Sequence, residues 1–145
     1  MFRYPEGIYV WNGQSWHQEL DTHTDRQMVI YKMAFGSFYG TLYCITSQGL
    51  KIVDKGKLIS PEWWKTQSHK SFPTSVLEDS KGNIWVAGND GGAWAYDKKQ
   101  WIHYTYENGF SNETVTAFYE DTEGNIWLAT NGSGMFRFAG NSFTY

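Results

Sequence analysis

The sequence predicts an all-β protein, a β-propeller whose blades each contain four antiparallel strands, with about three and a half blades in residues 1–145. Three observations predict this fold. A pattern recurs about every 42 residues, short apolar runs alternate with glycine-containing turns, and no useful length of chain shows helical periodicity. Because 145 residues fit one domain, we expect a single propeller arc.

The clearest repeat pairs SVLEDSKGNIWVAGNDGGAWAY, which begins at Ser75, with AFYEDTEGNIWLATNGSGMFRF, which begins at Ala117. The recurring positions are Asp79, Gly82, Trp85 and Gly92 in the first copy, and Asp121, Gly124, Trp127 and Gly134 in the second. The aspartate of such a turn accepts hydrogen bonds from backbone N–H groups, and the glycine adopts the left-handed conformation. The tryptophan lies in a strand that is apolar on both faces, which must be covered on both sides, as it is between propeller blades. We therefore expect these residues to be structural.

Four units follow one another along the chain. Residues 1–20 are expected to form a partial blade, because only the back part of the later repeats is matched there. The three further blades are predicted at residues 28–60, 74–106 and 113–145. In the second unit the expected strands are residues 28–35, 42–45 and 50–53, with a fourth beginning at 57–59. Pro61 ends that unit because it has no N–H to donate to a neighbouring strand.

The third and fourth units resemble the two-component-regulator propeller repeat. The resemblance is carried by EDSKGNIWVAG with GGAWAYD, and by NGFSNETVTAFYEDTEGNIWLATNGSGMFRF. It is weaker in the second unit and covers only residues 7–16 of the first. The resemblance implies four-stranded propeller blades of the kind found in the extracytoplasmic sensor half of bacterial hybrid histidine kinases. Such domains are thought to recognise carbohydrate or similar ligands.

Composition and charge exclude several classes of function. The net charge is −3, acidic and basic residues are interspersed, and there is no basic run that could neutralise phosphates. We therefore expect neither nucleic-acid nor membrane binding. No 18-residue apolar stretch and no signal-peptide pattern is present. The sequence therefore does not indicate the cellular compartment of the protein. The single cysteine, Cys44, cannot form an internal disulfide.

The sequence offers no local signature of a metal, cofactor or catalytic site. The four histidines lack metal-ligand spacing, and the Asp-x-x-Gly-Asn segments lack the alternating acids of a calcium loop. No nucleophile with a neighbouring base and no phosphate-binding loop is recognisable. We predict no metal, no cofactor and no enzymatic activity, with a propeller lyase or hydrolase as a minor alternative.

Four residues are candidates for ligand binding. Trp63 and Trp64 lie in residues 61–73, the least repetitive part of the chain. Adjacent aromatics in an extended segment cannot both face one core, so one of them could present a flat surface to a sugar. The alternative is that they cap a blade or form an interface between copies. Lys51 and Arg137 lie in apolar third strands and could line a central channel, or they could extend from a sheet edge into water.

An open arc of this length would leave two apolar blade faces in water. Closed propellers have roughly 4 to 8 blades, so two copies could complete a ring, and we expect a homodimer with eight pseudo-equivalent blades. The predicted function is a non-enzymatic binding or sensor-like module for a glycan or a protein partner. The alternative is a structural or assembly part of a larger propeller protein.

Overall fold

The computed structural model describes residues 7–21, 28–65, 71–111, 113–140 and 142–145. The described residues form four antiparallel sheets, in each of which the strands follow one another in chain order. The first sheet has two strands, β1 (Gly7–Trp11) and β2 (Trp16–Asp21). The second contains β3 (Ile30–Phe35), β4 (Leu42–Thr46), β5 (Gly49–Asp54) and β6 (Lys57–Ile59).

The third sheet contains β7 (Pro73–Glu78), β8 (Ile84–Gly88), β9 (Ala93–Tyr96) and β10 (Trp101–Tyr104). The fourth contains β11 (Val115–Glu120), β12 (Ile126–Thr130), β13 (Met135–Phe138) and β14 (Phe143–Thr144). Two short helical turns connect them, α1 (Glu62–Lys65) and η1 (Tyr106–Asn108).

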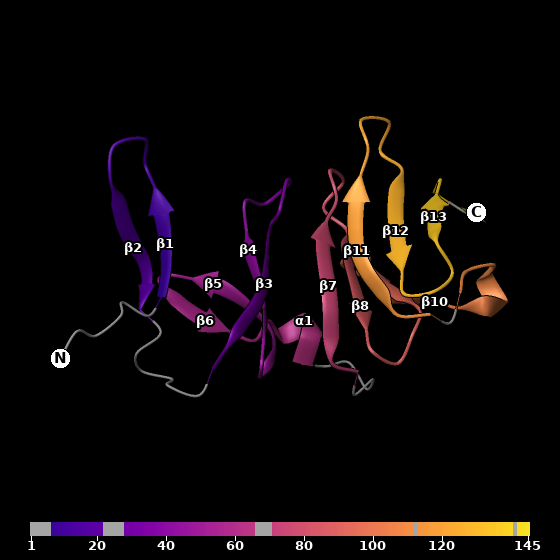
Figure 1. Cartoon of the computed structure of the whole chain (residues 1–145), viewed down its shortest axis with the longest axis horizontal. Coiled ribbons are helices and arrows are strands. Elements are labelled where there is room, and N and C mark those ends of the chain that lie inside the picture. Colours follow the sequence, from indigo (N-terminus) through magenta and orange to yellow (C-terminus); the bar gives the residue numbers. More distant parts are fainter. Residues whose placement is uncertain (1–6, 22–27, 66–70, 112, 141) are drawn as a thin grey trace.

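Figure 1 shows the sheets following one another from the N-terminal to the C-terminal end of the molecule. The predicted all-β propeller architecture of about three and a half blades is confirmed. Of the predicted partial blade at residues 1–20, residues 1–6 lie outside the described part.

The core lies between neighbouring sheets. The cluster between the second and third sheets contains Tyr43, Ile45, Leu50, Val76, Ile84 and Val86. The cluster between the third and fourth contains Trp85, Ala87, Ala93, Ala95, Phe110, Val115, Ile126, Leu128, Phe136 and Phe138. Ile8, Leu20 and Cys44 join the first sheet to the second, and burial raises the pKa of the Cys44 thiol to about 11. Strands that are apolar on both faces are thus covered by a sheet on each side wherever a neighbour is present.

Each repeated aspartate holds both its own turn and the tryptophan that follows. Asp79 accepts hydrogen bonds from the backbone N–H groups of Lys81 and Asn83, and from the indole Nε1 of Trp85 at 3.1 Å. Gly82, with φ 77°, supplies the left-handed residue of the turn. The second copy is built in the same way, with the indole Nε1 of Trp127 2.8 Å from Asp121. The carboxylate therefore links a local turn to an aromatic ring on the next strand.

The first strands of three sheets, β3, β7 and β11, lie next to one another and are called the innermost strands. Each is irregular near its start. The register shifts between Ile30 and Lys32 in β3, between Pro73 and Ser75 in β7, and between Val115 and Ala117 in β11. A bulge of this kind leaves one residue outside the ladder of its own sheet. Its backbone groups are then available to another sheet.

Candidate functional site

The connection between the second and third sheets begins with a helical turn. Pro61, whose carbonyl accepts from the N–H groups of Trp64 and Lys65, opens α1. Proline suits this place because its fixed φ fits a helix start and its missing N–H would have no partner there. The expectation of an extended segment is therefore wrong for residues 62–65. As a result Trp63 and Trp64 both pack against the cluster between the second and third sheets. Residues 66–70 of this connection lie outside the described part.

Trp63 is the centre of an aromatic group. Its ring stacks on Tyr96, with the centroids 5.9 Å apart and the planes 17° apart. It also lies 6.0 Å from the ring of Trp101 and 6.5 Å from that of Tyr43. The indole of Trp101 donates to the backbone carbonyl of Trp63 at 3.3 Å, which fixes α1 on the third sheet. Trp63 is thus held by rings from two different sheets.

A cavity of about 310 Å³ opens beside Trp63, between the second and third sheets. Its lining consists of Tyr39, Thr41, Tyr43, Ile52, Trp63, Ile84, Tyr96 and Lys98. The lining is mostly aromatic and aliphatic, with a hydroxyl from Thr41, phenol groups and a single ammonium group. This combination of apolar walls with a few polar groups is typical of small-molecule sites.

Lys98 is held at the cavity by its turn and by two rings. Its Nζ lies 4.9 Å from the ring centroids of both Phe38 and Tyr39, a distance at which a cation is attracted to an aromatic face. The residue has φ 72°, in the left-handed region that a lysine seldom adopts. The turn is stabilised by Asp97, which accepts from the N–H groups of Lys99 and Gln100. These two backbone hydrogen bonds hold the pKa of Asp97 below its ordinary value.

A buried carboxylate supports the wall of this cavity. Glu78, which is 1% exposed, accepts from the Tyr43 hydroxyl at 2.6 Å. It also accepts from the N–H groups of Phe38 and Tyr39, at 2.8 and 2.6 Å. Burial and then the hydrogen bond to Glu78 raise the pKa of Tyr43. Glu78 thus fixes both the phenol and the turn that carries Tyr39, so its role here is to shape the cavity.

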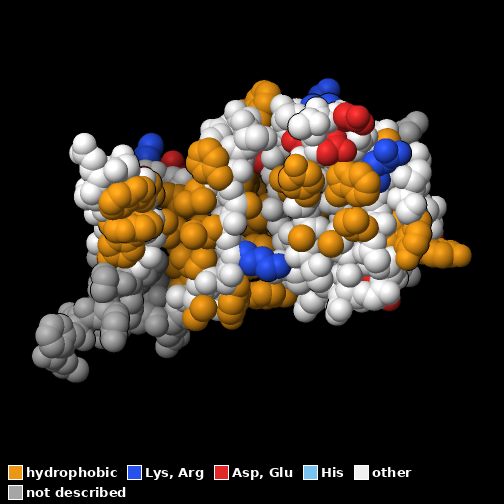
Figure 2. Space-filling view, turned by 45° about the horizontal axis from the view of Figure 1, so that its top comes forward, with side chains coloured by type: hydrophobic (Ala, Val, Ile, Leu, Met, Phe, Trp, Pro, Cys, Tyr) orange, Lys and Arg blue, Asp and Glu red, His pale blue; other side chains and the backbone are white. Residues whose placement is uncertain are grey.

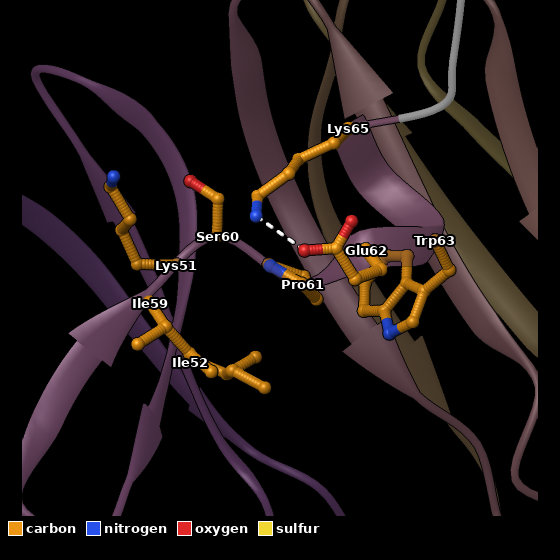
Figure 3. Close-up of a pocket in the computed structure, with 8 residues that line it drawn as sticks. All are labelled: Lys51, Ile52, Ile59, Ser60, Pro61, Glu62, Trp63 and Lys65. Carbon is orange, nitrogen blue, oxygen red and sulfur yellow. Dashed lines mark hydrogen bonds and ion pairs between the residues drawn. The ribbon is translucent and has the colours of Figure 1, made fainter.

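A second, wider concavity of about 650 Å³ lies along α1 and shares Trp63 with the first. Its lining consists of Lys51, Ile52, Ile59, Ser60, Pro61, Glu62, Trp63 and Lys65. Figure 3 shows Lys51 and Trp63 on opposite sides of it, with Glu62 and Lys65 joined by a hydrogen bond between them. Ammonium groups from β5 and from the end of α1 thus line the same concavity as the indole, and that of Lys65 is paired with Glu62.

The four candidate residues lie in different places. Lys51 and Trp63 line the same concavity, whereas Trp64 lines a separate hollow of about 410 Å³ together with Phe72. Arg137 lies on the fourth sheet, with its guanidinium 5.9 Å from the ring of Trp127. The structure therefore brings Lys51 to Trp63 and leaves Arg137 apart from both.

Sequence reasoning missed most of the cavity lining. Tyr96 and Tyr43 belong to strands of the repeat, and Lys98 and Tyr39 belong to its turns, so their spacing indicates scaffold alone. A comparison of the repeat units could have indicated them. The second unit has Phe38 and Tyr39 where the third has Ser80 and Lys81 in the same turn. Aromatics in place of polar turn residues indicate a turn that contacts another part of the protein.

Two features are absent from the described residues. No group of three or more histidine, cysteine, aspartate or glutamate side chains is placed where it could hold a metal ion. Across the same residues, no helix has the length and apolar character needed to cross a membrane.

Comparison with known proteins identifies the repeats and the fold. Residues 67–90 and 109–132 match the family model described as two component regulator propeller. No curated protein matches the sequence. Among solved structures, the extracellular domain of a hybrid two component system, BT4673 from B. thetaiotaomicron, aligns over 96% of this chain with a TM-score of 0.67 and 17% identity. The alignment covers 19% of that much longer chain. A second structure of the BT4673 extracellular domain, described as a one component system, has a TM-score of 0.41 and 19% identity over 90% of this chain and 25% of that one.

Proposed function

We propose that this chain, whose residues 67–90 and 109–132 match the two component regulator propeller model, is a non-enzymatic, sensor-like propeller module. Its ligand site is the aromatic cavity between the second and third sheets, and its ligand is a glycan. The sensor-like role is supported by the family and by the likeness in fold to the extracellular domain of a hybrid two component system.

The observation that carries this proposal is the position of Trp63. The indole lines both concavities, stacks on Tyr96, and has Lys98 at the edge of one concavity and Lys51 at the other. Aromatic faces bind the apolar C–H surface of a sugar ring, while ammonium and phenol groups provide hydrogen bonds to its hydroxyls. A site of about 310 Å³ has room for one or two sugar rings.

The test is calorimetric titration with a panel of neutral and acidic oligosaccharides. Trp63→Ala and Lys98→Asn should each weaken binding at least about fivefold, because each removes a direct contact. Asparagine suits position 98 because it tolerates the positive φ found there. The matched controls are Trp11→Ala, an exposed tryptophan of the first sheet, and Lys99→Asn, the exposed neighbour of Lys98.

Two results would contradict the proposal. One is the absence of binding by the folded wild-type chain across the panel. The other is binding that Lys98→Asn leaves unchanged, since that variant tests the site even if Trp63→Ala lowers stability. Short peptides form a second panel, because a protein partner would use the same aromatic surface.

We also propose that further blades complete the arc to a closed ring. One source is self-association with a second copy, which would give the expected homodimer. The second candidate, a part of a larger propeller, is favoured by the length of the BT4673 domain, of which this chain aligns to 19%. Sedimentation equilibrium separates the two, because only self-association gives a mass that rises with concentration.

A further inference from the structure

Each junction between complete sheets contains the same carboxylate contact. The glutamate that ends an innermost strand reaches back to the turn of the preceding sheet. Glu78, at the end of β7, accepts from the N–H groups of Phe38 and Tyr39 in the second sheet. Glu120, at the end of β11, accepts from the N–H and the hydroxyl of Ser80 in the third, at 2.7 and 2.5 Å. The two glutamates stand 42 residues apart, so the contact belongs to the repeat.

The turn of the fourth sheet repeats the donor side of this contact. Thr122 stands one repeat after Ser80, in the turn that Asp121 holds, and it offers the same N–H and hydroxyl pair. Thr122 is exposed, and within the described residues no glutamate from another sheet contacts it. The fourth sheet therefore presents half of a junction.

The fourth sheet has one face that points away from the third sheet. This outward face is apolar and is not covered by another sheet within the described residues. In the third sheet this face consists of Leu77, Trp85, Ala87, Ala93 and Ala95, all of which pack in the cluster against the fourth sheet. One repeat later the same positions are Tyr119, Trp127, Ala129, Met135 and Arg137. Here Tyr119 is 64% and Met135 56% exposed, and Figure 2 shows hydrophobic side chains on the surface over β11 and β12.

We propose that this face and Thr122 form a docking surface for a complete propeller blade whose innermost strand ends in a glutamate, supplied by polypeptide other than these 145 residues. The proposal rests on the proposed completion of the arc and names the blade that continues it. The incoming glutamate accepts from Thr122 as Glu120 does from Ser80. The incoming sheet covers Trp127 as the fourth sheet covers Trp85.

The same geometry argues against a second copy as the occupant. The first sheet of a copy contains β1 and β2, which correspond to third and fourth strands, and its described residues include no innermost strand. In the second sheet the residue that ends the innermost strand, paired with Leu42 as Glu78 is paired with Ile84, is Phe35, which has no carboxylate. Glu78 and Glu120 are already engaged within the chain. A second copy therefore has no described glutamate in position for Thr122.

Arg137 adds a requirement on the incoming blade. It occupies the position of the buried Ala95, and its guanidinium lies against Trp127. A guanidinium that becomes covered needs hydrogen-bond acceptors, since an unpaired buried charge is strongly unfavourable. The blade must therefore place a carboxylate or backbone carbonyl groups opposite Arg137.

The test extends the full chain by a second copy of residues 104–145, which continues the 42-residue period and brings a second Glu120 to Thr122. In the matched control the added copy carries Glu120→Ala. Amide hydrogen exchange at Thr122 should slow about tenfold or more with the glutamate-bearing blade, and clearly less with the alanine-bearing one. Oxidation of Met135 by peroxide should slow in both, relative to Met33, which is 55% exposed on β3 and serves as internal reference.

Two outcomes would overturn the proposal. One is a folded added blade that leaves the exchange at Thr122 and the oxidation of Met135 unchanged. The other is protection of both sites in the unextended chain as its concentration rises, which would make a second copy the occupant. The glycan titrations report on Trp63 between the second and third sheets, so failure of the ligand site and failure of this surface are separable.

Discussion

The ammonium group of Lys32 lies 2.9 Å from the backbone carbonyl oxygen of Thr74, 42 residues later in the chain. It donates equally to the carbonyl of Thr116, 84 residues later, also at 2.9 Å. The bulges of β7 and β11 free these two carbonyls from their own ladders. A single side chain of the second sheet thus joins the innermost strands of three sheets.

Replacing Lys32 should therefore lower the stability of the contacts between the three sheets. Lys32→Met keeps the aliphatic stem and removes both hydrogen bonds, and we expect the free energy of unfolding to fall by about 1–3 kcal/mol. Urea denaturation measures it, with Lys57→Met, at an exposed position of β6, as the control. Equal losses in the two variants would mean that the Lys32 contacts contribute nothing specific.

The contact of Glu78 should be more important than that of Glu120. Glu78→Leu leaves the N–H groups of Phe38 and Tyr39 and the Tyr43 hydroxyl without their acceptor in a buried site. We expect a loss of about 3–5 kcal/mol in unfolding free energy. Glu120 is only half-buried and its hydrogen bonds to Ser80 lie near the surface, so the loss in Glu120→Leu should be about 1 kcal/mol. Thermal and urea unfolding measure the loss in each variant. A larger loss in Glu120→Leu than in Glu78→Leu would contradict the prediction that the more buried carboxylate contributes more to stability.

Two tryptophans that look identical in the sequence should differ in their contribution to stability. Trp85 is 3% exposed, between the third and fourth sheets, whereas Trp127 lies half-buried on the outward face of the fourth. Trp85→Ala should lower the unfolding free energy by about 3–5 kcal/mol, and Trp127→Ala by about half of that. Equal losses, measured by urea denaturation, would show that the outward face is covered in solution.

The stability of the chain should depend on the ionisation of Asp121. Hydrogen bonds from Trp127 and then Asn125 lower its pKa from 3.8 to about 2 in the folded protein. Since the folded pKa is the lower one, this contribution to stability is present above pH 4 and is lost as the pH falls toward 2.

The variant Asp121→Asn should flatten that part of the pH profile, which unfolding measurements between pH 2 and 5 would show. Asp90→Asn, on an exposed loop, is the matched control. An Asp121 carboxyl that titrates near 4 by NMR in the folded wild type would contradict the prediction.

Much of the fold could be predicted because the repeat depends on interactions between residues that are close in the sequence. The Asp79 and Asp121 turns depend on residues within six positions of the aspartate, so sequence alone indicates them. The sequence indicated much less of the candidate site. Trp63 and Lys51 were found as departures from the repeat, whereas Tyr96 and Lys98 join them only because two sheets meet.

The sequence by itself determined the order of the strands, their turns and the positions of the repeated tryptophans, because hairpins form between neighbours in the chain. Only the tertiary structure decided that α1 turns both Trp63 and Trp64 onto one cluster, and that Glu120 reaches Ser80 across 40 residues. It also decided that Trp85 is covered while Trp127 lies on an open face. The physical reason is that burial depends on which sheet stands beside a strand, and that neighbour is not encoded in the strand itself.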